Sequence, residues 1–536
     1  MRSGTDRSFD VPIKIKPARW SKVDLPDRLY YLESCRNNLR RIAPFWIEEE
    51  ANLRGHSPQS PEGAESWLLG PFPVARTLRY LINGVKSGGR PKVPSRRLRI
   101  DGRSVSRVFP NGFHEGLMFY DIQAKVWCTG SQLQGSRYRK ARDGMPGPSL
   151  VLGGASVSSI LATDLLSKLF CENRPVVCKI PPRLASLEPI YREVFHPLIR
   201  DHHLQLLSGD AEVGKQLLKN PVFSNVHLTG TAHTHQAVLQ ANRVEDRTFT
   251  AELGCVTPVM IVPGPWSQRE LLYQARHLAS ILTINGGYTC VTPQILVLSK
   301  NWSHKGAFLR ALRSALEEFS HRDDQYPGAE QRRLSFRADY PQGEELGQRT
   351  LVSLPPHQPT RLFEEESFCG MLGIVELEAR HPEEFMKSAA NFCNRSLWGD
   401  LSIMVIVDQQ SRRLYERAVA QTIAALEYGT VSLNVYSGLA FASAVTPWGS
   451  YSDGRSDTGN GWYHNPYFFD RPEKTVMEGS FMPASPQPWV KPFHNLQKVG
   501  AAVFELDLEP SPRAFARFLK AFGKSMLKEH RRKEKL

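Results

Sequence analysis

The sequence predicts an α/β protein with two mostly parallel β-sheets and a further β-rich element. First, segments from Ser149 onward alternate between strand-like and helix-like patterns: "SLVLGG", "SSILATDLLSKLFCE", "PVVCKI", "LASLEPIYREVFHPLIRDH", "LQLLSG", "AEVGKQLLKN" and "NVHLTG". Second, the alternation starts again near Thr250, with "PVMIVPG", "SQRELLYQARHLASILTI" and "QILVLS". This order implies parallel strands with helices on both faces of each sheet.

The length of 536 residues implies more than one core. Residues 1–109 are expected to form a partly helical lead-in, and residues 110–250 and 251–440 to form the two α/β regions. Residues 441–536 are expected to complete the first region and the β-rich element. That element is predicted from the short β-like runs "LRIDGRSVSRVF", "GLMFYDI" and "KVWCTG", near 98–145.

Composition excludes several classes of protein. Hydrophobic residues make up 41% of the chain, which is typical of a globular protein. No apolar run approaches the ~18–20 residues of a membrane span, and the N-terminus has no apolar segment of the kind found in secretory signals. The eight cysteines are scattered without a CxxC pair, so neither a metal site nor a disulfide framework is expected. We therefore expect a cytoplasmic protein with free thiols.

The net charge of +14 is concentrated in residues 86–107 and 528–536. No nucleic-acid-binding signature accompanies these segments, so they are interpreted as solvated basic faces, and no nucleic-acid partner is expected. The C-terminal segment "SPRAFARFLKAFGKSMLKEHRRKEKL" places apolar residues on one helical stripe. Packing on the protein itself is favoured for this helix, and peripheral contact with a membrane surface is the alternative.

One cysteine has unusual surroundings. In "NGGYTCVTPQ", Cys290 follows two glycines and precedes a strand-like run. A structural cysteine is ordinarily a small buried hydrophobe, whereas a reactive thiolate needs access and a polar setting. A glycine turn would let the backbone approach a substrate closely. Cys290 is therefore a candidate nucleophile. The other cysteines are expected to be structural, although Cys255 lies close to Glu252 in sequence.

The segments around this cysteine resemble a known family. "AELGCVTPVMIVPG" (251–264) followed by "NGGYTCVTPQILVL" (285–298) resembles the paired Glu-Leu-Gly and Gly-x-x-Cys signatures of the aldehyde dehydrogenase superfamily. Four further segments are similar to family motifs and occur in family order: "PVVCKIPP", "HLTGT", "LFEEESFCG" and "VTPWGSYSDG". The resemblance implies an aldehyde-dehydrogenase-like fold, with a Rossmann-type cofactor domain at 110–250, a catalytic thiol domain at 251–440 and a β-rich oligomerisation element.

The resemblance also implies a reaction. Cys290 would attack an aldehyde to give a thiohemiacetal, hydride would pass to NAD or NADP, and a thioester would remain on the enzyme. The backbone N–H of Cys290 would help to hold the oxyanion. Glu252 matches the general base that activates water to release the carboxylic acid.

The cofactor residues follow from the same motifs. By resemblance, Lys179 would contact a ribose. Thr229, Gly230 and Thr231 would meet the pyrophosphate at a helix N-terminus. In "EEESF", Glu366 would contact the nicotinamide ribose and Phe368 would support the nicotinamide ring, with a register that could differ by one.

Two departures from the family pattern bear on the chemistry. Ser156 aligns with the asparagine that stabilises the oxyanion, and losing such a donor can cost ~10²–10³ in rate. Pro182 stands where many NAD-preferring members have a glutamate, so a 2′-phosphate would not be repelled and both NAD and NADP remain open.

Two alternative functions remain open from the sequence. One is NADPH-dependent reduction of an acyl thioester, such as an acyl-coenzyme A, to an aldehyde, which Glu252 disfavours. The other is a non-catalytic relative that binds a nucleotide, which the presence of both Cys290 and Glu252 disfavours. The expected partners are a small aldehyde and a second copy of the chain, because the family forms homodimers or homotetramers. The lead-in and residues 461–481 are similar to a longer, poorly characterised branch of the superfamily, and they indicate no substrate.

Overall fold

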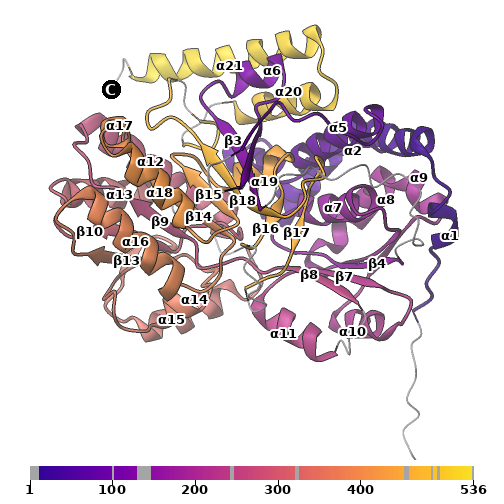
Figure 1. Ribbon diagram of the computed structural model, residues 1–536, viewed down its shortest axis with the longest axis horizontal. Helices are drawn as coiled ribbons and strands as arrows, with labels where there is room; N and C mark the ends of the chain where they lie inside the picture. Colours follow the sequence, from indigo (N-terminus) through magenta and orange to yellow (C-terminus); the bar gives the residue numbers. More distant parts are fainter. Residues whose placement is uncertain are drawn as a thin grey trace, which may run out of the picture.

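The computed structural model describes residues 11–98, 102–129, 147–241, 247–319, 325–451, 458–484, 487–491 and 495–533 (Figure 1). All secondary structure below refers to these residues. Part of the predicted β-rich run near 98–145 lies outside them, as do residues 99–101 of the basic segment 86–107 and the last three residues of the chain.

The first sheet has five parallel strands in the order β6-β5-β4-β7-β8. They are β4 (Ser149–Leu152), β5 (Val176–Ile180), β6 (Leu204–Ser208), β7 (Asn225–Thr229) and β8 (Thr248–Glu252). The connecting helices are α7 (Ser158–Leu166), η1 (Ser167–Cys171), η2 (Pro182–Leu187), α8 (Glu188–Val194), α9 (His196–Arg200), α10 (Ala211–Lys219) and α11 (Ala232–Ala241). From β4 the chain first adds β5 and β6 on one side of the sheet and then returns to add β7 and β8 on the other side. The strand order therefore reverses at β4. In open α/β sheets, ligands bind at the carboxyl ends of strands around such a point.

The second sheet has eleven strands in the order β1-β2-β3-β18-β15-β14-β9-β10-β13-β12-β11. Its parallel part comprises β9 (Pro258–Ile261), β10 (Ile295–Ser299), β12 (Arg349–Leu354), β13 (Met371–Leu377), β14 (Ser402–Ile406), β15 (Thr430–Leu433) and β18 (Pro472–Glu478). The short strand β11 (Glu344–Leu346) pairs antiparallel at one edge. The mixed α/β class with parallel sheets, predicted from the sequence, is confirmed.

Helices cover this second sheet. They are α12 (Gln268–Thr283), η3 (Ile284–Gly287), α13 (Lys305–Phe319), α14 (Ala329–Asp339), α15 (Arg361–Glu364), α16 (Pro382–Ser396), α17 (Gln409–Leu414), α18 (Glu416–Ala425) and α19 (Gly438–Ser443). A two-stranded ribbon of β16 (Trp448–Gly449) and β17 (Trp462–Tyr463) lies between the two sheets (Figure 1). An antiparallel bridge from Ala251 to Asn460 ties this ribbon segment to β8.

The β-rich element lies at the far edge of the second sheet. It consists of β1 (Ser95–Leu98), β2 (Ser104–Phe109) and β3 (Gln123–Cys128), which pair antiparallel with one another. β3 also pairs antiparallel with β18, so the element extends the sheet of its own chain.

The lead-in is more regular than the sequence predicts. It contains α1 (Pro17–Trp20), α2 (Leu25–Leu53), α3 (Pro61–Ala64), α4 (Ser66–Leu69) and α5 (Pro71–Lys86). Asp24 caps the 29-residue α2 by accepting from the backbone N–H of Asp27. The buried face of α2 packs against α5 and α8, in one hydrophobic cluster with the helices of the first sheet. Packing therefore makes the lead-in part of the first α/β body.

The C-terminal helices cover one end of the molecule. α21 (Pro512–Lys533) lies over α20 (Leu496–Leu508) and α6 (Phe113–Met118), at the top of Figure 1. Phe518 is buried in a cluster with Leu496, Val499 and Leu506. The expected packing of this amphipathic helix on its own protein is confirmed. Within the ranges that the structure covers, no helix combines the length and the apolarity that crossing a membrane requires.

Candidate active site

A strained turn carries Cys290. After α12 ends, Asn285, Gly286 and Gly287 all have positive φ, at 50°, 67° and 85°. Arg349 donates from Nη2 to the carbonyl oxygen of Gly286 at 2.5 Å. A Cβ on Gly287 would lie 2.9 Å from the backbone oxygen of Leu282 and 2.7 Å from the guanidinium nitrogens of Arg349, and its φ of 85° also favours glycine. These contacts hold the turn that precedes Cys290 in one conformation.

Asn285 ties this turn to two other parts of the chain. Its Nδ2 donates to the carbonyl oxygens of Ser156 at 2.9 Å and Tyr288 at 2.8 Å. Its backbone N–H donates to Oε2 of Glu65, in the lead-in, at 3.0 Å. Asparagine tolerates the left-handed region better than most residues, so this position combines the backbone conformation with three hydrogen bonds.

Cys290 and Glu252 meet at one cavity of about 520 Å³. The Glu252 carboxyl group, at the end of β8, lies close enough to the Cys290 thiol and to Trp448 for both to lower its pKa, although its Oε1 has no hydrogen-bond partner among the described residues. Burial raises the pKa of Glu252 to about 7, and the negative charge of Asp164 adds to that effect. Burial, with the Glu252 charge, also holds the pKa of the Cys290 thiol well above its usual value. In this state the pair holds a neutral thiol beside a carboxyl group that can take up its proton.

Cys290 differs from the other cysteines in its exposure. All eight are free, and seven are buried, whereas Cys290 is partly exposed. Cys255 packs against Gly399, and its Sγ lies 3.1 Å from Oγ1 of Thr257. Cys290 is therefore accessible to a ligand, whereas Cys255 is not.

Tyr463 is a site residue that the sequence did not single out. It lines the same cavity and is 3% exposed, and its hydroxyl has no hydrogen-bond partner among the described residues. Burial raises its pKa well above the usual value, and the charges of Glu252, Asp164 and Cys290 contribute. Its segment, "GWYHNPY", differs from the family pattern, so no motif could have indicated it.

Ser156 does not line this cavity in the described part of the chain, whereas the next residue, Val157, does. Its carbonyl group is used to hold Asn285. The structure thus places Cys290, Glu252 and Tyr463 in the lining of one cavity, and Ser156 lies next to that lining without being part of it.

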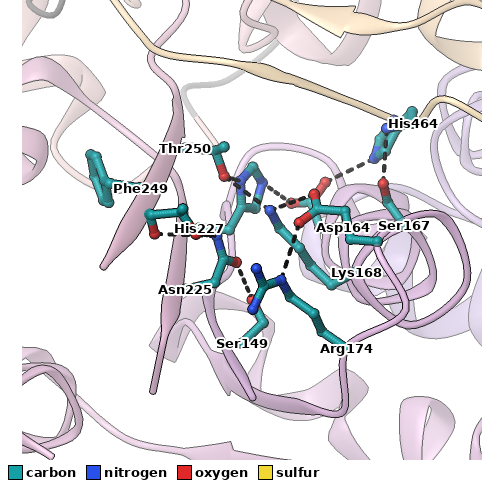
Figure 2. Close-up of polar contacts among 12 residues, drawn as sticks. Ser149, Asp164, Ser167, Lys168, Arg174, Asn225, His227, Phe249, Thr250 and His464 are labelled. Atoms are coloured by element: carbon teal, nitrogen blue, oxygen red, sulfur yellow. Dashed lines mark hydrogen bonds and ion pairs between the residues drawn. The ribbon is translucent and has the colours of Figure 1, made fainter. Parts of the chain in front are cut away.

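Figure 2 shows a buried polar network around Asp164, whose charge also raises the pKa of Glu252. Asp164, on α7, accepts from Oγ1 of Thr229 at 2.8 Å and lies 2.9 Å from Nε2 of His464. His227 approaches the same carboxylate, with Nε2 3.5 Å from Oδ2, and its Nδ1 lies 2.8 Å from Oγ1 of Thr250. Although burial opposes ionisation, contacts with His227 and His464 hold the pKa of Asp164 below its usual range. The network joins the first sheet to His464, the residue that follows Tyr463.

The predicted cofactor residues follow the carboxyl edge of the first sheet. Thr231 caps α11, since its Oγ1 accepts from the backbone N–H of Thr234 at 3.2 Å. Gly230 donates its backbone N–H to the carbonyl oxygen of Glu252 at 3.0 Å. Lys179 is at the end of β5, half-buried, and its pKa is lowered by burial, although the Asp210 charge opposes this.

Glu366 and Phe368 lie between the two sheets. A Cβ on Gly254 would meet Oε1 of Glu366 at 2.8 Å, so the carboxylate sits against that glycine. Oε1 of Glu366 has no hydrogen-bond partner among the described residues, and burial raises the pKa well above its usual value. Glu364 and Glu365 are exposed instead. Phe368 packs with Tyr288 and Tyr326 at centroid distances of 5.6 and 5.0 Å. Of the three consecutive glutamates, Glu366 is thus the one next to the site.

A second cavity, of about 670 Å³, lies between α11 and the α15 region. Polar and charged side chains line it, including His233, Gln236, Thr360 and Arg361.

No protein-family model matches the sequence. Over 155 residues, which are 29% of this chain and 34% of the relative, the chain is 24% identical to AldX of Bacillus subtilis (strain 168), which is named as an aldehyde dehydrogenase. The matched part thus spans about a third of that relative's length.

Solved structures match over most of the chain. The P. syringae AldA indole-3-acetaldehyde dehydrogenase, in complex with NAD+ and IAA, is 15% identical with a TM-score of 0.60, covering 86% of this chain and 85% of that one. The aldehyde dehydrogenase KauB from Pseudomonas aeruginosa is 15% identical with a TM-score of 0.60, covering 85% of both chains. The resemblance that the motifs predict is confirmed at the level of the fold.

Proposed function

Because the chain has the fold of the aldehyde dehydrogenase superfamily, we propose that it oxidises an aldehyde to a carboxylic acid with NAD or NADP, through a covalent intermediate on Cys290. The observation that carries the proposal is that the accessible thiol of Cys290 and the buried carboxyl group of Glu252 line the same cavity, which is large enough for a substrate. A nucleophile beside a base that can take its proton is the arrangement that covalent catalysis requires.

The residues support a sequence of proton movements. Glu252 takes the thiol proton as Sγ of Cys290 bonds to the aldehyde carbon, and Tyr463 is available to donate its hydroxyl proton in a hydrogen bond to the developing oxyanion. A nicotinamide, when bound, would supply the hydride acceptor for this oxidation. Glu252 releases the thiol proton to solvent before it removes a proton from water, whose oxygen attacks the thioester carbon. The acid then leaves, and the proton on Glu252 returns to the thiolate of Cys290. A pKa of about 7 suits a group that must both accept and return a proton near neutrality.

The residues present fit a dinucleotide. The unpartnered Oε1 of Glu366 is placed to accept from a ribose hydroxyl, and Gly254 leaves room beside it. Lys179 would contact the adenosine ribose, the turn Thr229–Thr231 would hold the pyrophosphate, and Phe368 would support the nicotinamide ring. Asp210 lies close enough to Lys179 to affect its pKa, and such a carboxylate favours a ribose hydroxyl over a 2′-phosphate. Because Pro182 stands where many NAD-preferring members have a glutamate, the proposal includes both NAD and NADP.

The test is absorbance of the reduced nicotinamide with NAD+ or NADP+ and a panel of aldehydes. Cys290→Ala should abolish turnover, whereas Cys255→Ala, which changes the neighbouring buried thiol, should retain it. Turnover that survives Cys290→Ala would refute the covalent mechanism. If the protein instead reduces an acyl-coenzyme A with NADPH and oxidises no aldehyde, it works in the opposite direction, and bound nucleotide without either reaction would indicate a non-catalytic relative.

The proposal includes a cytoplasmic location and a homodimer or homotetramer. The first depends on the sequence alone and the second on the family resemblance. Sedimentation of the purified protein tests the assembly directly.

A further inference from the structure

The cavity that Cys290 and Glu252 share reaches far beyond these two residues. Its lining comes from the lead-in helices, from α6 and the segment after it, from α19 and from the two C-terminal helices. Besides the site residues, the wall includes Phe72, Phe119, Leu439, Trp489, Val503 and Phe522. The wall thus continues from the thiol, which lies just before β10, to a helix more than two hundred residues later in the sequence.

The wall is mainly aromatic and aliphatic, and its charged groups already have partners. Glu65 accepts from the backbone N–H of Asn285 at 3.0 Å. Glu318 receives two hydrogen bonds from Arg276, at 2.7 and 3.0 Å. Lys491 donates to Oγ1 of Thr283 at 3.0 Å. These groups lose little by contact with an apolar ligand, because their hydrogen bonds are made within the protein.

The sign of the charges also limits the ligand. In addition to Glu252, the lining contains four carboxylates, Glu62, Glu65, Asp121 and Glu318, and a single ammonium, Lys491. Cations offset two of these carboxylates, since Arg276 pairs with Glu318 at 2.7 Å and Lys491 lies 3.9 Å from Glu65. The lining nevertheless has more acidic than basic groups, which disfavours an aldehyde with its own carboxylate.

Helix α21 forms the outer wall. Phe518 is buried and Phe522 is partly buried, and both line the cavity. The ring of Phe515 lies 6.4 Å from that of Phe113 on α6. The opposite face is exposed and charged, as at Arg517 and Lys520. α21 is therefore an amphipathic cover whose apolar face belongs to the cavity.

We propose that this cavity takes an uncharged aldehyde with a long hydrocarbon chain, whose carbonyl group lies at Cys290 and whose chain extends toward α21. This inference rests on the proposed function for the position of the carbonyl group. The cavity volume is within the ~300–1,000 Å³ typical of small-molecule sites. Each methylene that leaves water contributes enough to raise kcat/KM about fourfold until the cavity is filled.

The test compares propanal, hexanal and dodecanal with wild-type protein and three variants. Dodecanal should have the highest kcat/KM. Phe522→Glu, which puts a charge in the wall, and Val503→Trp, which fills the outer part, should each lower kcat/KM for dodecanal by about tenfold or more. Both should leave propanal within about twofold, since the site near Cys290 is unchanged. Leu519→Glu, on the exposed side of the same helix, should change neither.

Three results would overturn the inference: equal kcat/KM for propanal and dodecanal, a preference for an aldehyde with a carboxylate, or equal loss for both lengths in the variants. A binding measurement separates this failure from failure of the proposed function. Dodecan-1-ol should protect Cys290 from a thiol reagent in wild-type protein and much less in Phe522→Glu. If no aldehyde is oxidised but protection is seen, the cavity assignment stands and the reaction is wrong; absence of protection refutes the cavity assignment.

Discussion

Glu252→Gln separates the two consequences of burying this carboxyl group. Glu252 is 4% exposed, and its pKa is raised from an ordinary 4.5 to about 7. Ionising it therefore costs about 3 kcal/mol more in the folded protein than in the unfolded chain. Below pH 4.5 the group is neutral in both states and nothing is lost. Between pH 4.5 and about 7 the unfolded chain releases this proton while the folded protein keeps it, so stability is lost progressively over this range and the loss is complete above pH 7.

Glutamine cannot ionise, so the variant should gain stability relative to wild type as pH increases. The gain should reach about 3 kcal/mol in mildly alkaline solution and fade toward pH 5. Turnover should change in the opposite direction, because loss of a general base costs ~10²–10⁴ in rate. In wild-type protein, base-dependent turnover should rise about tenfold between pH 6 and pH 8, with its midpoint near pH 7.

Thermal unfolding at a series of pH values and steady-state reduction of the nicotinamide measure the two effects. Glu317→Gln, an exposed glutamate on α13, is the matched control and should show neither. A wild-type rate that is flat between pH 6 and pH 8 would contradict the reasoning. So would a Glu252→Gln variant whose stability difference from wild type does not depend on pH.

Three further variants test parts of the site. Tyr463→Phe removes a buried hydroxyl without a described partner, so kcat should fall by ~10²–10³ with unchanged thermal stability; an unchanged kcat would exclude it as an oxyanion donor. Asp164→Asn removes the charge from the network behind Thr229, so unfolding free energy should fall by ~3–5 kcal/mol and the KM for the cofactor should rise; a fully stable variant would show that the network is not a stabilising one. Gly287→Ala places a Cβ against the guanidinium group of Arg349 at φ 85°, so both stability and turnover should decrease, with a cost of at least ~1–2 kcal/mol; a fully active variant would refute the view that the turn has one conformation.

The sequence by itself determined the elements with local signatures. The two alternations of strand and helix patterns predicted the parallel sheets, because hydrophobic periodicity and glycine turns act over a few residues. The glycine turn selected Cys290, whereas Glu252 was selected by the resemblance of its segment to a family motif. Hydrophobic periodicity also predicted the apolar stripe of α21, whose packing on the chain itself the structure confirms.

Only the tertiary structure decided how distant segments meet. Tyr463, Trp448 and α21 reach the cavity of Cys290 from the last hundred residues, and no local pattern encodes a contact across that separation. The lead-in became part of the first α/β body because the buried face of α2 needs α5 and α8 to cover it. Ser156 shows the converse case: an alignment places it at the oxyanion position, but its backbone carbonyl holds Asn285 and the cavity wall begins with Val157. The pKa of Glu252 is likewise a tertiary property, since burial between two sheets, and not the residue type, raises it.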